Sequence, residues 1–263
     1  MDQAVNVICV GDSITYGSYI DQGGLPYPNQ LLTLLGAGNT VVNRGHPAWT
    51  LAQLVANFST DVTVALSSTK ENVVILFAGT NDLYFSADLQ SNPQPIIDDM
   101  VEYIGLAHGV GSKILIATMI QRGSVGAGSM AGYWSARETI NSAIMSDAVD
   151  VWGADGICNF AGTASQFETQ FTGNGPSGWY TDTAHLTGAA LAYPTAEAYA
   201  KTQLLYPDAP TYTNWLGYAL DPAGTGPQVG NHGRHVLVLS NDPAASSVRV
   251  VRGGVRYRLR RAE

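Results

Sequence analysis

A serine close to the N-terminus stands where a nucleophile would stand in an α/β protein. The segment Gly11 to Thr15 directly follows an apolar run from Ala4 to Val10. A serine at the end of a first strand, beside a glycine that permits a tight turn, is held at the rim of the sheet with its hydroxyl exposed. Alternatively, Asp12 and Ser13 only cap a following helix, since both accept hydrogen bonds from free backbone N–H groups. The choice depends on the partners that follow along the chain.

A serine hydroxyl is a poor nucleophile near neutral pH and needs a base. Of the five histidines, His185 is the best placed, because Asp182 precedes it by three residues. On a single turn this carboxylate can reach one imidazole nitrogen and leave the other free to face a serine. Asp182 could also be a helix N-cap, a role that does not exclude the first. Two further histidines, His232 and His235, make no strong metal site, so no metal ion or cofactor is predicted.

Acyl transfer also needs donors aimed at the oxyanion that develops on the carbonyl. Gly45 can present a backbone N–H at close approach, because it has no side chain in the way. Asn81 can present a side-chain amide at the end of its strand. Each of these residues alone is also explained by ordinary turn chemistry. Gly45 and Asn81 are therefore candidate oxyanion donors, and the case for them depends on the other motifs of the chain.

The elements that must position these residues alternate between short apolar runs and amphipathic segments. Strands are predicted at 4–10, 40–43, 72–78, 113–119 and 157–160, and helices at 29–35, from 50, at 92–110, 130–148 and 186–205. This alternation is typical of an α/β fold with a mainly parallel sheet and helices on both faces. In such folds the ligand lies outside the carboxyl ends of the strands, where the polar clusters fall.

Four short blocks then resemble, in order, those of the SGNH (GDSL) hydrolase superfamily. They are Gly11-Asp12-Ser13-Ile14, Asn43-Arg44-Gly45, Gly79-Thr80-Asn81-Asp82 and Asp182-Thr183-Ala184-His185. The resemblance covers about residues 4–205. It implies a flavodoxin-like, three-layer α/β/α fold with a five-stranded sheet. It also implies ester hydrolysis through an acyl-enzyme.

The resemblance assigns a role to each matching residue. Ser13 is the nucleophile and an oxyanion donor through its own N–H, and Gly45 and Asn81 are the other donors. His185 is the base and Asp182 its orienting acid. In one departure, this chain has Ala48 where the family often has a further glycine, so the loop that carries Gly45 could be shaped differently.

The substrate is indicated only by aromatic residues next to the catalytic blocks. They are Trp49, Tyr84, Phe85, Trp179 and Tyr180, which could stack on a sugar ring, line an acyl pocket or belong to the core. No long apolar lid is evident, which favours short acyl chains and water-soluble esters, carbohydrate acetyl esters among them. The alternatives are a thioesterase or lysophospholipase, or a non-catalytic carbohydrate-binding relative.

Composition excludes several classes of partner. The chain has 263 residues, a formal net charge of −8 and only 13% charged residues, so nothing favours nucleic acid or an anionic membrane surface. No apolar run approaches the roughly 20 residues of a membrane span. We expect a soluble protein, either in a bacterial cytoplasm or secreted with its signal peptide removed. Cys9 and Cys158 lie in apolar runs and are predicted to be structural free thiols.

The chain changes character near Pro207. Residues 1–206 hold 6 Lys and Arg against 17 Asp and Glu, whereas residues 207–263 hold 7 against 4. A hydrolase domain at 1–206 and a small β-rich extension at 207–263 are predicted, the latter with a basic hairpin over 247–260. This hairpin could dock on the acidic body, self-associate with a partner chain or touch a polyanion. The first is favoured, because a basic edge keeps an exposed strand from aggregating.

Overall fold

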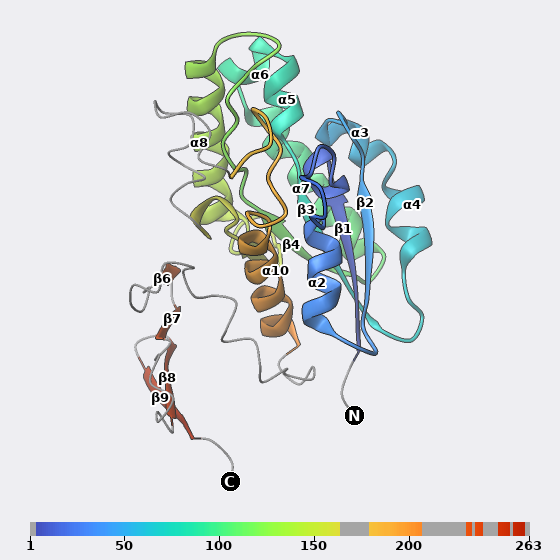
Figure 1. The fold of residues 1–263 in the computed structure, drawn as a ribbon, viewed down its shortest axis with the longest axis vertical. Coiled ribbons are helices and arrows are strands. Elements are labelled where there is room, and N and C mark those ends of the chain that lie inside the picture. Colours follow the sequence, from blue (N-terminus) through green and yellow to red (C-terminus); the bar gives the residue numbers. More distant parts are fainter. Residues whose placement is uncertain are drawn as a thin grey trace. The chain divides into compact units, whose positions relative to one another are not determined.

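The computed structural model describes residues 4–163 and 179–206, together with the segments 230–232, 235–238, 247–252 and 255–260. Its centre is a five-stranded sheet in the order β2-β1-β3-β4-β5, in which every pair is parallel (Figure 1). The strands are β1 Val5–Gly11, β2 Thr40–Gly45, β3 Glu71–Phe77, β4 Lys113–Ala117 and β5 Gly156–Cys158. The predicted fold class is confirmed.

Two adjacent interior strands, β1 and β3, carry long apolar runs. All seven residues of β1 are buried, as are the last five of β3. Such runs suit strands that helices cover on both faces. In the order 2-1-3-4-5 the connections leave β1 in opposite directions, which opens a crevice at the carboxyl ends of β1 and β3. These strands end side by side, with Gly11 opposite Phe77.

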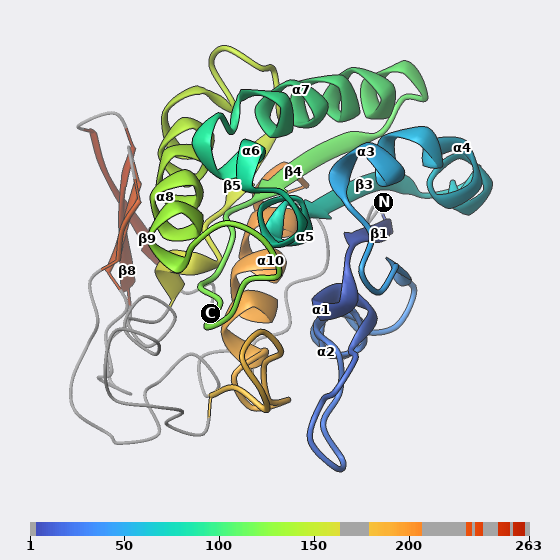
Figure 2. The same ribbon diagram turned by 90° about the horizontal axis from the view of Figure 1, so that it is seen from above.

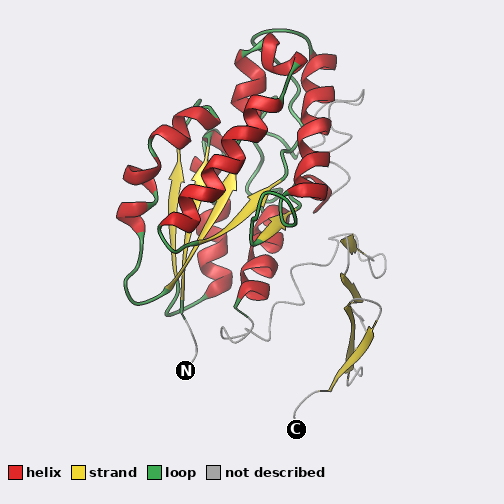
Figure 3. Ribbon diagram, turned by 180° about the vertical axis from the view of Figure 1, so that it is seen from behind, coloured by secondary structure: helices red, strands yellow, loops and turns green. Residues whose placement is uncertain are grey.

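Helices cover both faces of this sheet and complete the three layers (Figures 2 and 3). On one face α2 packs against α10, and on the other α7 packs against α3 and α8. The helices are α1 Ser13–Tyr16, α2 Tyr27–Leu35, α3 Leu51–Ala56, α4 Phe58–Asp61, α5 Thr80–Phe85, α6 Ala87–Ser91, α7 Gln94–Gly109, α8 Met130–Asp147 and α10 Ala192–Leu205. The 3₁₀ turns are η1 Thr63–Ala65 and η2 Ala161–Thr163.

The last helix starts later than its sequence pattern predicts. Helix α10 begins at Ala192, whereas the pattern predicts a start at Leu186. Leu186 instead forms an isolated antiparallel bridge with Tyr180, and residues 188–191 form turns before the helix begins. Pro194 therefore lies in the first turn, where its missing N–H costs no helical hydrogen bond, and it does not kink the helix.

Both cysteines are buried free thiols, as predicted. Burial raises the pKa of the Cys9 thiol to about 12, against a smaller lowering by its hydrogen bond with Tyr27. Such a thiol is inert and serves only packing. Within the described residues, no helix is long and apolar enough to cross a membrane.

The C-terminal strands form a separate antiparallel sheet in the order β6-β7-β8-β9. They are β6 Gly230–His232, β7 His235–Val238, β8 Ser247–Arg252 and β9 Val255–Arg260. The predicted two-glycine turn at 253–254 lies outside the described residues. The chain divides into compact units at Met1–Tyr212 and Thr213–Glu263. A domain boundary at 206 and a docking role for the hairpin stay predictions.

Candidate active site

Ser13 lies on the first turn after β1, at the carboxyl edge of the sheet. Gly11 ends the strand, and a Cβ there would come within 2.3 Å of the Phe77 carbonyl oxygen. Asp12 caps the short helix α1, because its Oδ1 accepts a hydrogen bond of 2.9 Å from the Ile14 N–H. The helix-capping interpretation of this segment is therefore correct for Asp12. It leaves the Ser13 hydroxyl free for another partner.

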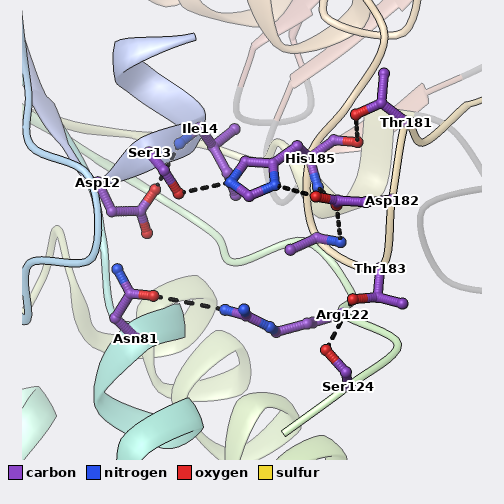
Figure 4. A network of polar contacts seen from close by, with 11 residues as sticks. Asp12, Ser13, Ile14, Asn81, Arg122, Ser124, Thr181, Asp182, Thr183 and His185 are labelled. Atoms are coloured by element: carbon purple, nitrogen blue, oxygen red, sulfur yellow. Dashed lines mark hydrogen bonds and ion pairs between the residues drawn. The ribbon is translucent and has the colours of Figure 1, made fainter. Parts of the chain in front are cut away.

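That partner is His185, which the fold brings to Ser13 from 172 residues away. The His185 Nε2 lies 2.8 Å from Ser13 Oγ, and its Nδ1 lies 2.7 Å from Asp182 Oδ2 (Figure 4). The three predicted side chains thus form one continuous series of hydrogen bonds. The segment that carries two of them is not helical, so the spacing of three residues acts through a turn.

Asp182 is built to stay ionised and to fix the imidazole. Its Oδ1 accepts hydrogen bonds of 2.7 Å from the N–H groups of Ala184 and His185. Partial burial raises the pKa of this carboxyl, but these two bonds and the contact with the His185 ring outweigh burial and lower the pKa below its usual value. An ionised Asp182 can only accept, so the proton belongs on His185 Nδ1. Nε2 then presents its lone pair to Ser13.

Asn81 lies on the other side of the nucleophile, at the start of α5. Its Nδ2 donates to the Trp49 carbonyl oxygen at 2.9 Å, and its Oδ1 accepts a long hydrogen bond of 3.5 Å from Arg122 Nη1. These two contacts distinguish the nitrogen of the Asn81 amide from its oxygen. In Figure 4 the amide nitrogen is on the side of Asp12 and Ser13, while the oxygen faces Arg122. One N–H of Asn81 remains available beside the nucleophile.

Arg122 follows β4 and is held in place by an aromatic ring. Its guanidinium lies 3.9 Å from the centroid of the Tyr84 ring, and the Trp134 Nε1 donates to its carbonyl oxygen at 3.1 Å. This cation faces the oxygen of the Asn81 amide and leaves its nitrogen on the side of Ser13. Sequence reasoning missed Arg122, because nothing in the local pattern links it to Asn81.

Gly45 is required by packing, and its N–H already has an acceptor. A Cβ at Gly45 would lie 2.1 Å from the Tyr16 backbone nitrogen, so only glycine lets α1 approach β2 here. The Gly45 N–H donates to Asn43 Oδ1 at 2.9 Å, and the Asn43 amide in turn donates to the Thr15 carbonyl oxygen. The backbone of Gly45 thus approaches α1 closely, as expected, but its N–H is not free to bind a substrate oxygen.

Ala48, three residues later, has a backbone N–H that makes no hydrogen bond within the described residues. Its φ of 66° lies in the left-handed region, which glycine adopts without strain. The loop therefore keeps the shape that a glycine at this position would allow. Within the described residues the Ala48 N–H has no acceptor. Its neighbour Trp49 contacts Asn81 through the carbonyl oxygen, so this N–H belongs to the same corner of the site.

Two buried carboxyls lie under this corner of the site. Burial raises the pKa of Asp12 to about 7, against the lowering effects of the Ile14 N–H and the Arg122 charge. Burial likewise raises the pKa of Asp82 to about 6, although the Leu51 N–H donates to both of its oxygens. Asp82 thereby fixes the start of α3 against α5.

The aromatic residues predicted to bind substrate have different surroundings. Trp49 stacks on His46 at 3.9 Å between ring centroids, and Trp179 contacts Tyr193 at 4.8 Å. Tyr84 supports Arg122 and contacts Phe85, which is 52% exposed. Tyr180 is only 4% exposed, and its hydroxyl donates to the Gln121 carbonyl oxygen. Its ring is part of the core, which is one of the three alternatives left open for it.

One aromatic residue next to the site was not predicted. The Tyr19 ring lies 4.8 Å from the His185 ring, between centroids. It is 73% exposed and has a φ of 55°. An exposed tyrosine in a loop carries no periodic signal. Its position three residues after Tyr16, just beyond the serine block, was the only available hint.

Comparison with solved structures shows the same fold. LAE5, an α/β hydrolase enzyme from the metagenome of Lake Arreo, has a TM-score of 0.54 at 18% identity, over 78% of this chain and 98% of its own. Axe2, an acetylxylan esterase from Geobacillus stearothermophilus, has a TM-score of 0.53 at 16% identity, over 76% and 95%. Est24, a carbohydrate acetylesterase from Sinorhizobium meliloti, has 0.52 at 16%, over 78% and 100%.

Comparison at the level of sequence identifies the family. No curated protein matches the chain. The model of the GDSL-like lipase/acylhydrolase family matches residues 9–201, a span that runs from the middle of β1 into α10 and contains all four blocks. The chain therefore belongs to the GDSL-like lipase/acylhydrolase family, and it is a carboxylic ester hydrolase.

Proposed function

We propose that this enzyme hydrolyses short-chain carboxylic esters, with O-acetyl groups of carbohydrates as its substrate class, through a Ser13-His185-Asp182 triad. One observation carries the proposal. His185 Nδ1 donates to Asp182 Oδ2 at 2.7 Å, and the Ser13 hydroxyl donates to His185 Nε2 at 2.8 Å, which is the length needed for proton transfer. The pKa of Asp182, lowered on balance, supports the ionised form that this relay needs.

Acylation begins when Ser13 Oγ attacks the ester carbonyl carbon. His185 Nε2 takes the hydroxyl proton, and the resulting imidazolium is stabilised by the ionised Asp182. The tetrahedral intermediate collapses as the bond to the leaving alcohol breaks. His185 then gives its proton to the leaving oxygen, so the alcohol departs neutral and the acyl group stays on Ser13.

The oxyanion is stabilised by three N–H groups for which the described residues provide no acceptor. They are the Ser13 N–H, the second amide N–H of Asn81 and the Ala48 N–H. Within the described residues, neither backbone donor has an acceptor. Ala48 takes the place that the resemblance assigns to Gly45, because the Gly45 N–H is bound to Asn43. Arg122 strengthens the Asn81 donor through its contact with the amide oxygen.

Deacylation repeats the sequence with water. His185 takes a proton from water as the water oxygen attacks the acyl carbonyl carbon, and the same N–H donors stabilise the oxyanion. The bond from the acyl group to Ser13 then breaks, and His185 returns the proton to Ser13 Oγ as the acid departs. The balanced reaction is one ester and one water to one acid and one alcohol. The proposal uses no cofactor and no metal ion at any step.

Three considerations support acetyl esters of carbohydrates. Two proteins that share the fold act on such esters, as their names state. The sequence has no evident long apolar lid segment of the kind that would cover a long acyl chain. Exposed aromatic rings near the site, Phe85 among them, suit the flat carbon faces of sugar rings.

A panel of esters tests this proposal. We expect kcat/KM to be highest for acetyl or propionyl esters in a series from acetyl to palmitoyl, and acetylated xylo-oligosaccharides to release acetate. Ser13→Ala should lose these activities while its thermal unfolding stays cooperative. A maximum at palmitoyl would favour a lysophospholipase, and a preference for acyl thioesters a thioesterase. Binding of the sugars without any hydrolysis would indicate a non-catalytic relative.

A further inference from the structure

Tyr19 combines three features that core packing does not explain. Its side chain is 73% exposed, its backbone has a φ of 55°, and its ring lies 4.8 Å from the His185 ring at an angle of 47°. A left-handed conformation is unfavourable for a tyrosine, which lacks the freedom of glycine. Strained residues of this kind cluster at active sites and ligand contacts, which makes Tyr19 a candidate for a role at the site.

The segment that carries Tyr19 is fixed at both ends to the catalytic elements. On one side it follows directly from α1, whose C-cap Gly17 has a φ of 91° and whose first residue is Ser13. On the other side Asp21 Oδ1 accepts a hydrogen bond from the Gly188 N–H, three residues beyond His185. Gln30 donates to the Gly188 carbonyl oxygen at 2.8 Å and reinforces this link. Tyr19 is therefore anchored between the nucleophile and the base.

The position of the leaving group follows from the proposed mechanism, on which this inference rests. To be protonated, the leaving oxygen must lie within about 3 Å of His185 Nε2. The acyl part lies on the opposite side, with its carbonyl oxygen toward Asn81. The alcohol must therefore extend outward past His185, where Tyr19 stands exposed against the imidazole.

We propose that Tyr19 is a specificity-determining residue, a platform on which the leaving alcohol stacks. An aromatic face binds the flat carbon face of a pyranose or an aryl ring, and it gains little from a small, flexible alcohol. The substrate class is thereby narrowed to esters whose alcohol part carries a ring. The acyl part is recognised elsewhere, so Tyr19 acts on acylation and leaves hydrolysis of the acyl-enzyme unchanged.

The test compares substrates that share one acyl group. We would measure kcat/KM for ethyl acetate, phenyl acetate and an acetylated methyl xylopyranoside with the wild type, Tyr19→Ala and Tyr19→Phe. Tyr19→Ala should lose about tenfold with the two ring-bearing acetates, mainly through KM, and less than twofold with ethyl acetate. Tyr19→Phe keeps the face of the ring and should stay within twofold throughout.

Two further variants keep the result interpretable. Tyr19→Gly accepts a φ of 55° without strain, so it truncates the ring in a chain whose folding is not in question. Tyr16→Ala removes a tyrosine from α1 that is 56% exposed and has no contact with the His185 ring in the described part of the chain. We expect Tyr19→Gly to match Tyr19→Ala, and Tyr16→Ala to show no dependence on the leaving group.

Equal losses on all three acetates would overturn the proposal, since Tyr19 would then act by holding His185 in place. No loss on any of them would overturn it as well. A wild type that hydrolyses none of the acetates would instead contradict the proposed function itself. The two failures are thus distinguished by the wild-type rates alone.

Discussion

Two aspartates are linked to Ser13, Asp182 through His185 and Asp12 as its neighbour in the chain, and their surroundings move their pKa values in opposite directions. Asp182 lies on an open turn and receives N–H donors on both oxygens, which together lower its pKa despite partial burial. Asp12 is 2% exposed, and burial raises its pKa to about 7. Hydrogen bonds to the charged carboxylate thus dominate the pKa of Asp182, whereas the loss of solvent dominates the pKa of Asp12.

The difference in pKa suits two different roles, because Asp182 is linked to Ser13 through His185, whereas Asp12 directly precedes Ser13 in the chain. Asp182 is kept ionised, which is what a residue that orients a protonated imidazole needs. Asp12 shapes the turn after β1 and holds α1 through the Ile14 N–H, and this needs no permanent charge. In the proposed mechanism Asp182 therefore serves the chemistry, whereas Asp12 serves the local structure of the turn that carries Ser13. The following predictions separate the two.

The largest effect is expected from Asp182→Asn. The amide can donate to His185 Nδ1, which moves the imidazole proton to Nε2 and removes the acceptor that Ser13 needs. We predict a fall in kcat/KM for 4-nitrophenyl acetate of about 10⁴-fold. The unfolding temperature should change little, because this side chain is half-exposed. A loss below tenfold would show that Asp182 does not orient the base.

The second effect concerns the oxyanion side. Asn81→Ala removes the only side-chain donor assigned to the oxyanion and should lower kcat by about 10² to 10³-fold. Arg122→Met leaves the amide in place but unpolarised, so a smaller loss of about tenfold is expected. Asn92→Ala, at an exposed asparagine after α6, is the matched control. Equal values for Asn81→Ala and this control would remove Asn81 from the mechanism.

The third prediction separates Asp12 from Asp182 through pH. A raised pKa means that the folded state favours protonated Asp12. Its contribution to stability is therefore full below the usual pKa of 3.8 and is lost as pH rises toward 7. Asp12→Asn keeps the cap on Ile14 and cannot ionise. The variant should gain stability over the wild type between pH 4 and pH 8, by about 4 kcal/mol at most.

Urea unfolding at four pH values checks this expectation. A stability difference between Asp12→Asn and the wild type that does not vary with pH would contradict it. We expect esterase activity of the variant to stay within tenfold, since Asp12 contacts neither Ser13 Oγ nor His185 in the described structure. Asp182→Asn is therefore expected to change mainly the activity, and Asp12→Asn mainly the free energy of unfolding.

The smallest effect concerns the strained backbone at Ala48. A φ of 66° costs an alanine about 1 kcal/mol that glycine avoids. Ala48→Gly keeps the N–H and should raise the free energy of unfolding by up to that amount. Ala52→Gly, at an exposed position inside α3, should lower it by up to about 1 kcal/mol. A loss at both positions would show that Ala48 is not strained.

Much of this architecture could be predicted from the sequence, because its causes are local. The apolar runs of β1 and β3 define buried strands, and parallel strands bring their carboxyl ends to one edge. Asp182 and His185 are three residues apart, so their contact needs only one turn. The structure places both beside Ser13, as the family pattern implies.

The remainder depends on contacts that no local pattern encodes. Arg122 meets Asn81 across 41 residues, and the start of α10 depends on a bridge between Tyr180 and Leu186. At Gly45 the residue type indicated an accessible N–H. An acceptor two residues earlier, the side chain of Asn43, binds that N–H, which is why we propose Ala48 as the backbone donor instead. Tyr180 is aromatic and close to the site, but the fold buries it.

The central claim is that Asp182 and His185 make Ser13 a nucleophile, and covalent labelling tests it most directly. The wild type and Asp182→Asn would be treated with an organophosphonate at neutral pH, and the adduct located by peptide mass spectrometry. The proposed mechanism predicts one phosphonyl group per wild-type chain, on Ser13, and far slower labelling of the variant. Labelling elsewhere, no labelling, or equal rates in the two proteins would contradict it.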